Sequence, residues 1–502
     1  MKYFFLISAA FWFSFSSAQK KPNILIILSD DHAYQSIGAY GSPYQATPNI
    51  DRLAKEGAVL ENAYVTNSIC GPSRAVLLTG KYSHKNGFRD NKNPNFNGDQ
   101  NTFVKELKAA GYQTAWIGKW HLGSTPQGFD YFQIVPGQGM YFNPDFILMD
   151  GSRVRREGYI ANIIEQLAEE WLASIDTSKP FCLIIGHKNT HRTWMPDTSD
   201  LRMFDHVNFP LPPNFYDDYE GRQAAKNQDM SISISMRMDY DLKMLPDDHK
   251  DGNFTRMNDD QRAAYAAYYG PIKKELEEAR PEGNALYEWK YQRYMRDYYA
   301  TAYSMDKNIG RMLDFLEKKG LTSNTMVTYM SDQGFYLGEH NWFDKRFIYE
   351  ESFRTPVIIR YPGYIPAGSR IDAPVVNIDF APTFMEAGGV TPGPDIQGIS
   401  FFKMLKGEKL PWRDAVYYHY YELGEHAVSP HFGIKKGNLK LIRFYKGVEA
   451  WEFFDLSSDP LEMHNLINDP SRADEIKKMK EELEKLILYY DDQEALTILK
   501  QN

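Results

Sequence analysis

Four short apolar segments, each followed at once by polar residues, constrain this chain more than any other feature of its sequence. They span residues 23–28, 113–117, 181–185 and 325–330. A continuous apolar run of this length is typical of a strand that is buried on both faces, as in a parallel sheet. Amphipathic stretches of helical period accompany them, at residues 49–56, 103–110, 160–175 and about 285–319. Strands that alternate with helices predict an α/β fold with a doubly wound, mostly parallel sheet.

The pattern changes near residue 401, which indicates a second domain. The chain has 502 residues, more than the roughly 250–300 that one hydrophobic core holds. Residues 415–457 read as antiparallel strands, and an amphipathic helix follows at 474–492. We expect a large domain over 19–400 and a smaller α+β domain with an antiparallel sheet over 401–502. The polar segment at about 195–283 is expected to be an insertion that packs over the sheet and shapes a pocket.

The N-terminus has the three parts of an export signal. Lys2 supplies the positive charge, residues 3–15 are apolar, and small residues precede Ala18. We expect cleavage after about Ala18 and export to the periplasm or the extracellular space. No later apolar run is long enough to cross a bilayer, so no membrane span is expected. The net charge of −9, without a long basic run, argues against nucleic-acid binding as the main function.

Acidic residues follow two of the apolar segments and predict a cation site. Asp30 and Asp31 follow the first segment, and Asp332 and Gln333 follow the last. In an open α/β sheet, the carboxyl ends of the strands line the ligand-binding crevice, so these side chains can converge. Carboxylates that converge repel one another unless a cation lies between them, and hard oxygen donors favour Ca²⁺ or Mg²⁺ over zinc. Taken singly, each aspartate could instead cap a helix or a turn.

The chain has two cysteines, in contrasting surroundings. Cys182 lies within an apolar segment, where cysteine behaves as a small hydrophobic residue. Cys70 precedes Pro72 at the expected start of a helix, and Arg74 follows one turn later. We expect no disulfide between them. A helix N-terminus attracts anions, so Cys70 is either a thiolate nucleophile with a lowered pKa or a packed thiol.

Longer motifs around Cys70 carry a family resemblance. The stretch SICGPSRAVLLTG, residues 68–80, resembles the first signature of the type I sulfatases, whose core is Cys-x-Pro-x-Arg. GYQTAWIGKWHLG, residues 111–123, resembles their second signature. Similar segments also occur at residues 23–32, 331–363 and 453–466. The resemblance therefore covers nearly all of the chain after the export signal.

The resemblance implies a fold and a chemistry. The fold would be the alkaline-phosphatase-like sandwich, with the catalytic domain at 19–400. In the family, a formylglycine-generating or sulfatase-maturating enzyme oxidises the cysteine corresponding to Cys70 to Cα-formylglycine. One hydroxyl of the hydrated aldehyde attacks sulfur, and loss of the proton from the other then expels sulfate. Arg74 would steady that hydrate.

By position, the resemblance also assigns the remaining site residues. One Ca²⁺ ion would be held by Asp30, Asp31, Asp332, Gln333 and modified Cys70, although many relatives have asparagine in place of Gln333. Lys119 and Lys345 would bind the sulfate group. His121 would assist the formylglycine, and His191 would protonate the leaving oxygen.

The leaving alcohol must be recognised by other residues. Asp344 and Arg346 flank Lys345 and could hydrogen-bond sugar hydroxyls. The surrounding segments resemble bacterial N-acetylglucosamine-6-sulfatases, which act on sulfated glycans of glycosaminoglycan and mucin. In that group, a histidine of the C-terminal domain reaches the sugar, and His426 and His431 are both candidates. His187 is a further candidate, either as a substrate contact or as a histidine that supports the site from behind.

Three alternatives remain open from the sequence. The substrate could be another carbohydrate sulfate. The enzyme could be a phosphodiesterase or phosphonate hydrolase of the same superfold, but Lys119 and Lys345 stand where such enzymes bind further metal, which favours sulfate. A glycan-binding protein without activity would be expected to have lost Cys70, Arg74 or the aspartates, and all are present.

Overall fold

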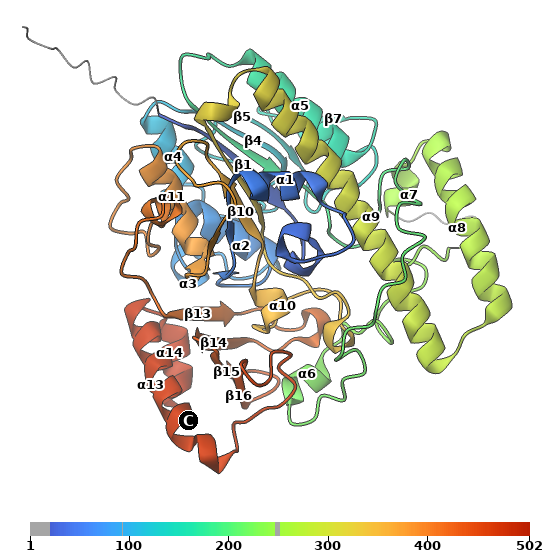
Figure 1. Ribbon diagram of the computed structural model, residues 1–502, viewed down its shortest axis with the longest axis vertical. Helices are drawn as coiled ribbons and strands as arrows, with labels where there is room; N and C mark the ends of the chain where they lie inside the picture. The colour runs from blue at the N-terminus through green and yellow to red at the C-terminus, as the bar shows by residue number, and fades with distance from the viewer. Residues whose placement is uncertain (1–20, 93, 246–251, 502) are drawn as a thin grey trace, which may run out of the picture.

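The computed structural model describes residues 21–92, 94–245 and 252–501. The expected export signal lies outside the described residues. Ten strands form the main sheet (Figure 1). In spatial order they are β11 Ser369–Ile371, β2 Ala58–Leu60, β10 Val357–Arg360, β9 Thr325–Ser331, β1 Asn23–Ser29, β8 Phe181–Gly186, β4 Gln113–Lys119, β5 Tyr131–Val135, β6 Asp145–Ile147 and β7 Arg153–Arg155.

The four apolar segments form the centre of this sheet, as predicted. β9, β1, β8, β4 and β5 run parallel to one another. The flanking strands make the sheet a mixed one, since β10 runs antiparallel to β9 and β2, and β6 runs antiparallel to β5 and β7. Parallel neighbours have their carboxyl ends at the same edge, and this edge carries the site described below.

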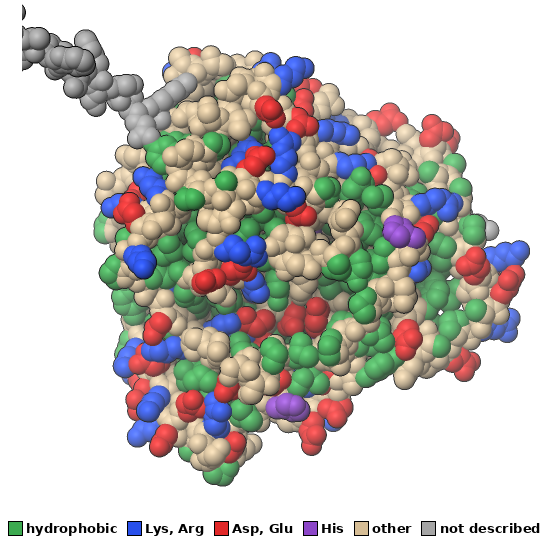
Figure 2. All heavy atoms as spheres, viewed as in Figure 1, with side chains coloured by type: hydrophobic (Ala, Val, Ile, Leu, Met, Phe, Trp, Pro, Cys, Tyr) green, Lys and Arg blue, Asp and Glu red, His purple; other side chains and the backbone are tan. Residues whose placement is uncertain are grey.

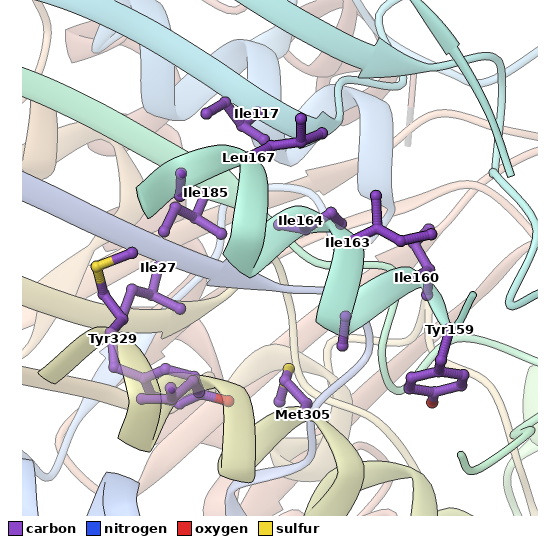
Figure 3. Close-up of a cluster of buried hydrophobic side chains, with 14 of the residues drawn as sticks. Ile27, Ile117, Tyr159, Ile160, Ile163, Ile164, Leu167, Ile185, Met305 and Tyr329 are labelled. Carbon is purple, nitrogen blue, oxygen red and sulfur yellow. The ribbon is translucent and has the colours of Figure 1, made fainter. Parts of the chain in front are cut away.

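Helices cover both faces of the sheet and make the fold a sandwich. Successive strand residues point to opposite faces, so Ile27 packs into one core and Ile26 into the other. The first core lies under α1 Pro48–Glu56, α5 Ile160–Ser174 and α9 Gly283–Lys318. The second lies under α2 Cys70–Thr79, α4 Phe103–Ala109 and α11 Phe380–Ala387. Figure 3 shows the first core, where Ile163, Ile164 and Leu167 of α5 meet isoleucines of the strands.

The C-terminal part forms a separate antiparallel sheet, with helices on one face (Figure 1). Its strands follow one another in space as in sequence: β13 Ala415–Tyr420, β14 His431–Lys436, β15 Leu439–Phe444 and β16 Ala450–Asp455. Helices α13 Ala473–Tyr489 and α14 Gln493–Lys500 pack against it. The short helix α12 Phe402–Leu405 instead packs into the second core of the large sheet. The second sheet therefore begins some residues after the change in sequence character at 401.

The polar segment at 195–283 contains α6 Gln223–Asn227, α7 Gly252–Arg256 and α8 Asp259–Ala279. α8 begins with a capping box between Asn258 and Gln261. Figure 1 shows α8 beside the N-terminal half of α9, away from the sheet. This part of the insertion thus extends the helical layer and does not lie over the strands as expected. None of the helices within the described ranges combines the length and apolarity needed to span a membrane.

One buried carboxylate joins α9 to the start of α1. Thr47 precedes α1 and gives its first turn no side-chain cap. Asp306 of α9 takes that part: its carboxylate accepts the backbone N–H of Asn49 at 3.0 Å and that of Ile50 at 2.9 Å. Asp306 is fully buried. If its carboxylate were removed, no water would be present to accept hydrogen bonds from these N–H groups.

We expect Asp306→Ala to lower the free energy of unfolding by about 2–3 kcal/mol, because buried N–H groups lose their acceptor. The measurement is thermal unfolding followed by circular dichroism. Arg52→Ala is the matched control: Arg52 of the same helix pairs with Asp314 and Glu317 of α9 at the exposed surface, where such pairs contribute about 0–1 kcal/mol. Equal melting temperatures for the two variants would contradict the capping role.

Candidate functional site

The carboxyl ends of the central strands bring together most of the residues predicted for the site. β1 ends before Asp30 and Asp31, β9 ends before Asp332 and Gln333, and β4 ends at Lys119. α2 begins at Cys70 and directs its N-terminus at the same place. The side chains of these residues are buried. The distances below show that they form one cluster.

Cys70 lies at the centre of the cluster. Its Sγ donates to Asp30 Oδ1 at 3.4 Å, and Gln333 Nε2 lies 3.6 Å from it. Gly71 must follow it, since a Cβ there would come within 2.6 Å of the Phe88 ring and within 2.5 Å of the Asn91 side-chain oxygen. The sequence left open a thiolate with a lowered pKa. Burial instead raises the pKa of the Cys70 thiol, and the charge of Asp30 adds to that rise.

Three carboxylates and three bases pair within the cluster. Lys119 Nζ binds Asp30 Oδ2. Lys345 Nζ binds both oxygens of Asp31, at 2.7 and 2.6 Å. Arg74 places Nε and a terminal nitrogen 3.0 and 2.9 Å from Asp332 Oδ2, and it donates to the backbone carbonyl of residue 119 at 2.8 Å. Each aspartate therefore has one cationic partner.

The pKa values of the three paired carboxylates are shifted in different directions. Burial acts to raise the pKa of Asp30, but Lys119 and the other nearby cations hold it well below its usual value. Burial raises the pKa of Asp31 despite Lys345. For Asp332, burial and the charge of Asp30 raise the pKa to about 7 against the effect of Arg74. Burial thus disfavours the charged forms of Asp31 and Asp332 despite their cationic partners, and an added cation would stabilise those charged forms.

The donor atoms of the cluster fit a hard divalent cation. Ligand atoms of Asp30, Asp31, Cys70 and His191 all lie within 4.8 Å of one another. The Gln333 Oε1 atom is buried and has no hydrogen-bond partner. The nitrogen and oxygen of an amide are assigned from their surroundings, so a half-turn of this group would direct its oxygen at the carboxylates. Carboxylate and amide oxygens are the ligands that Ca²⁺ and Mg²⁺ prefer.

Three of the predicted histidines follow strands of the main sheet. His191 Nδ1 donates to the backbone carbonyl of Arg192 at 2.7 Å, so Nε2, which lies 3.9 Å from Asp31 Oδ2, is the nitrogen that faces the cluster. Burial lowers the pKa of all three, to about 4 for His187 and well below the usual value for His121 and His191. The Nδ1 atoms of His121 and His187 are buried without a hydrogen-bond partner.

The residues that flank Lys345 meet a histidine of the C-terminal part. His426 Nε2 lies 3.3 Å from Asp344 Oδ2, and a terminal nitrogen of Arg346 lies 3.5 Å from Asp344 Oδ1. His426 Nδ1 donates to the backbone carbonyl of Asp229 in the insertion, at 2.6 Å. Burial acts to raise the pKa of Asp344, but Arg346 and Lys345 hold it well below its usual value. Arg346 Nε and Nη1 are buried without hydrogen-bond partners.

His431 is not brought to this group. Its ring is fully buried at the start of β14 and packs between Phe347 and Tyr418. Its Nε2 accepts the backbone N–H of Ile348 at 3.1 Å, and Nδ1 donates to the carbonyl of Ser429 at 2.9 Å. Both ring nitrogens are therefore used inside the protein. Of the two candidate histidines, the geometry favours His426.

Sequence reasoning missed three contributors. Gln138 Oε1 accepts from Lys119 Nζ at 2.5 Å, and Lys188 Nζ donates to the backbone carbonyl of Gln138 at 3.2 Å. Burial lowers the pKa of Lys188 to about 7, and the charge of Lys119 adds to the effect. Asp229 holds His426 through its backbone. The position of Lys188 just after β8 was a usable signal, whereas nothing in the sequence around Gln138 or Asp229 marked them.

Family models match most of the chain. The model described as Sulfatase matches residues 22–390. A second model, described as N-sulphoglucosamine sulphohydrolase, C-terminal, matches residues 338–488. Together they cover both sheets.

Individual proteins are similar over nearly the whole length. The chain is 47% identical over 489 residues to the N-acetylglucosamine-6-O-sulfatase of Bacteroides thetaiotaomicron, with 94% of this chain and 87% of that protein covered. It is 27% identical over 489 residues to the arylsulfatase of Clostridium perfringens, covering 93% and 94%. A protein solved in complex with its substrate, D-glucosamine-2-N,6-O-disulfate, has a TM-score of 0.92 and 46% identity, covering 94% of this chain and 99% of that one.

The raised pKa of the Cys70 thiol predicts a slow reaction with alkylating reagents. In protein whose Cys70 is unmodified, we expect iodoacetamide at pH 8 to react at least 10-fold more slowly than with a free cysteine, whose pKa is about 8.5, because only the thiolate reacts. The rate should keep rising above pH 9. Mass spectrometry of the residue 70 peptide gives the rate, and denatured protein is the control. Rapid alkylation at pH 6–7 would contradict the direction of the shift.

Proposed function

The chain belongs to the sulfatase family and is a sulfuric ester hydrolase, and from that premise we propose that it hydrolyses the 6-O-sulfate of N-acetylglucosamine in glycosaminoglycan or mucin glycans. One observation carries the substrate assignment. A single loop places Lys345 on Asp31 in the buried cluster and its neighbour Asp344 beside His426. Charges suited to a sulfate group and groups suited to sugar hydroxyls are therefore adjacent. The 47% identity to an N-acetylglucosamine-6-O-sulfatase supports the same substrate.

The proposed nucleophile derives from Cys70. We propose that a formylglycine-generating or sulfatase-maturating enzyme converts Cys70 to Cα-formylglycine. The hydrated aldehyde would supply an oxygen nucleophile with its own route for releasing sulfate. The raised pKa of the Cys70 thiol supports this assignment. A buried thiol that is seldom ionised is a weak nucleophile. Arg74, fixed on Asp332, keeps positive charge beside the start of α2.

We further propose that the cluster holds one Ca²⁺ ion. Asp30, Asp31, Asp332 and Gln333 would bind it, together with an oxygen of modified residue 70. When bound, the ion would neutralise the carboxylates and polarise a sulfate oxygen. The unpartnered Gln333 Oε1 and the raised pKa values of Asp31 and Asp332 support this proposal.

The roles of the remaining residues follow from their positions. Lys119 and Lys345 are buried cations that can bind sulfate oxygens as negative charge develops. His191 is oriented by its Nδ1–H bond, so Nε2 faces the cluster. Burial lowers its pKa, so Nε2 would carry the proton for the leaving sugar oxygen only once the negative charge of a bound sulfate raises that pKa. His426, Asp344 and Arg346 would bind hydroxyl groups of the sugar. The export signal expected from the sequence of residues 2–18 supports a periplasmic or extracellular site of action on a glycan substrate.

Substrate preference tests the proposed function directly. We expect the matured protein to release sulfate from N-acetylglucosamine 6-sulfate with a kcat/KM at least 100-fold above that for galactose 6-sulfate or glucosamine 2-sulfate. The reason is that His426, Asp344 and Arg346 would form hydrogen bonds with only one arrangement of sugar hydroxyl groups. Ion chromatography of free sulfate measures each rate, and Cys70→Ala is the inactive control. Faster release from another carbohydrate sulfate would overturn the substrate assignment while leaving the enzyme a sulfatase.

His426→Ala separates sugar recognition from sulfate chemistry. We expect kcat/KM for N-acetylglucosamine 6-sulfate to fall by about 10- to 100-fold, since one hydrogen bond to a charged group contributes about 1.5–3 kcal/mol. The rate with 4-nitrophenyl sulfate, which has no sugar hydroxyls, should change less than 3-fold. His464→Ala, at an exposed histidine, is the matched control. Equal losses on both substrates would assign His426 to the chemical step instead.

A further inference from the structure

A pocket of about 310 Å³ lies between α8, in the segment expected to be an insertion, and α9. The two helices form a hairpin at one side of the molecule (Figure 1). Arg202, Arg293 and Arg296 line the pocket, together with the aromatic residues Tyr268 and Trp289. None of its lining residues belongs to the buried cluster around Cys70.

Arg293 forms the buried part of this pocket. It is 3% exposed and binds Asp297 Oδ1 through a terminal nitrogen at 2.5 Å. Asp297 also binds Lys243 at 2.9 Å, so one carboxylate serves two buried cations. Arg293 Nε is buried with no hydrogen-bond partner. A buried N–H of a guanidinium without an acceptor is costly. Burial acts to lower the pKa of Arg293, but Asp297 raises it above its usual value, so the charge of this arginine is maintained.

The positive charge of Arg296 has no carboxylate partner among the described residues. Its Nε and a terminal nitrogen donate to the backbone carbonyl of Val207 at 3.2 and 3.1 Å. Across residues 21–92, 94–245 and 252–501, no carboxylate lies within 4.0 Å of its guanidinium nitrogens. Burial lowers the pKa of Arg296, and the charge of Arg293 lowers it further. Arg296 therefore has charge available for an anion, and Arg293 has one buried N–H that lacks an acceptor.

The pocket lining has fewer acidic residues than arginines, and one of the acidic residues already accepts a hydrogen bond. Asp205 accepts the hydroxyl of Tyr268 and lies 3.9 Å from Arg202, and Glu275 is exposed at the rim. The lining thus has three cations and two carboxylates. The Arg202 guanidinium also lies over the Tyr268 ring, 5.3 Å from its centre. The net charge of the lining is positive.

The walls and the volume indicate the kind of anion. Trp289 is half-buried, and an indole ring of this kind can pack against the apolar face of a sugar ring. The volume is at the lower end of the range for small-molecule sites, which suits one monosaccharide unit. Guanidinium groups bind the oxygens of sulfate with directed, charge-assisted hydrogen bonds.

We propose that this pocket is a second carbohydrate site, which binds one sulfated sugar residue of a glycan separately from the catalytic cluster. The proposal rests on the proposed function in one respect, that sulfated glycans are the substrates. Arg296 and Arg293 bind the sulfate group, and Trp289 packs against the sugar ring. Such a site holds a glycan chain on the enzyme between successive reactions and so raises its effective concentration at the catalytic cluster.

The test measures binding in Cys70→Ala protein, which holds substrate without turning it over. N-acetylglucosamine 6-sulfate is titrated by isothermal calorimetry against four variants made in this background: the parent, Arg296→Ala, Trp289→Phe and the control Lys274→Ala, an exposed lysine of α8. We expect two binding sites per chain in the parent and the control. Arg296→Ala should weaken one of them at least 10-fold and leave the other unchanged. Unsulfated N-acetylglucosamine should not bind to the weakened site.

A spectroscopic readout assigns that site to the pocket. The intrinsic fluorescence of the parent should change as the second site fills, and Trp289→Phe should lose this change while melting at the same temperature. One site in the parent, or two unaltered sites in Arg296→Ala, would overturn the proposal. Failure of the proposed function would be seen separately, as absence of sulfate release by the matured wild-type protein, whereas Arg296→Ala in the matured enzyme should release sulfate from the monosaccharide at the wild-type rate.

Discussion

The pairing of three buried carboxylates with three buried bases is the interaction on which the site depends. Asp30, Asp31 and Asp332 would be too costly to bury alone. Lys119, Lys345 and Arg74 make their burial possible. The parallel strands β1, β4 and β9 bring the three aspartates and Lys119 to one edge of the sheet, where Arg74 of α2 and Lys345 of a loop meet them. Burial still raises the pKa of Asp31 and of Asp332 despite these partners. The same arrangement therefore holds the carboxylates at this edge of the sheet and supports the proposal that a cation and a sulfate group bind there.

The loop at residues 344–346 connects the buried cluster with the C-terminal part of the protein. Lys345 binds Asp31 in the cluster, while Asp344 and Arg346 on either side of it turn toward His426. The Tyr418 hydroxyl of β13 donates to the carbonyl of Arg346 and accepts the backbone N–H of Ser68 just before Cys70. Docking of the C-terminal part thus fixes the position of Arg346, one of the groups proposed to bind the sugar, relative to residue 70. The insertion contributes too, since the carbonyl of Asp229 orients the His426 ring.

The central strands and the residues that follow them, Asp30, Asp31, Lys119, Asp332 and Gln333, could be predicted because a continuous apolar run and the polar residues at its end are local patterns. Lys345 follows no such run and was assigned only by the family resemblance. The choice between His426 and His431 could not, since both lie in one short segment and only the packing of the C-terminal sheet separates them. The other six strands of the main sheet, β2, β5, β6, β7, β10 and β11, were not predicted because their short segments carry little pattern. The 21-residue helix α8 was missed because its apolar periodicity is weak, and its capping box and contacts with α9 stabilise it instead.

The position of a bound calcium ion tests the central claim most directly. Crystals of the matured protein grown with CaCl₂ would be measured at a long wavelength, where calcium scatters anomalously. The account predicts one peak in contact with oxygens of Asp30, Asp31, Asp332 and Gln333, and an oxygen-bearing side chain at residue 70 beside it. Lys119 and Lys345 would then be released from Asp30 and Asp31. Both lysine–aspartate pairs intact at saturating calcium, with no peak between the carboxylates, would contradict it.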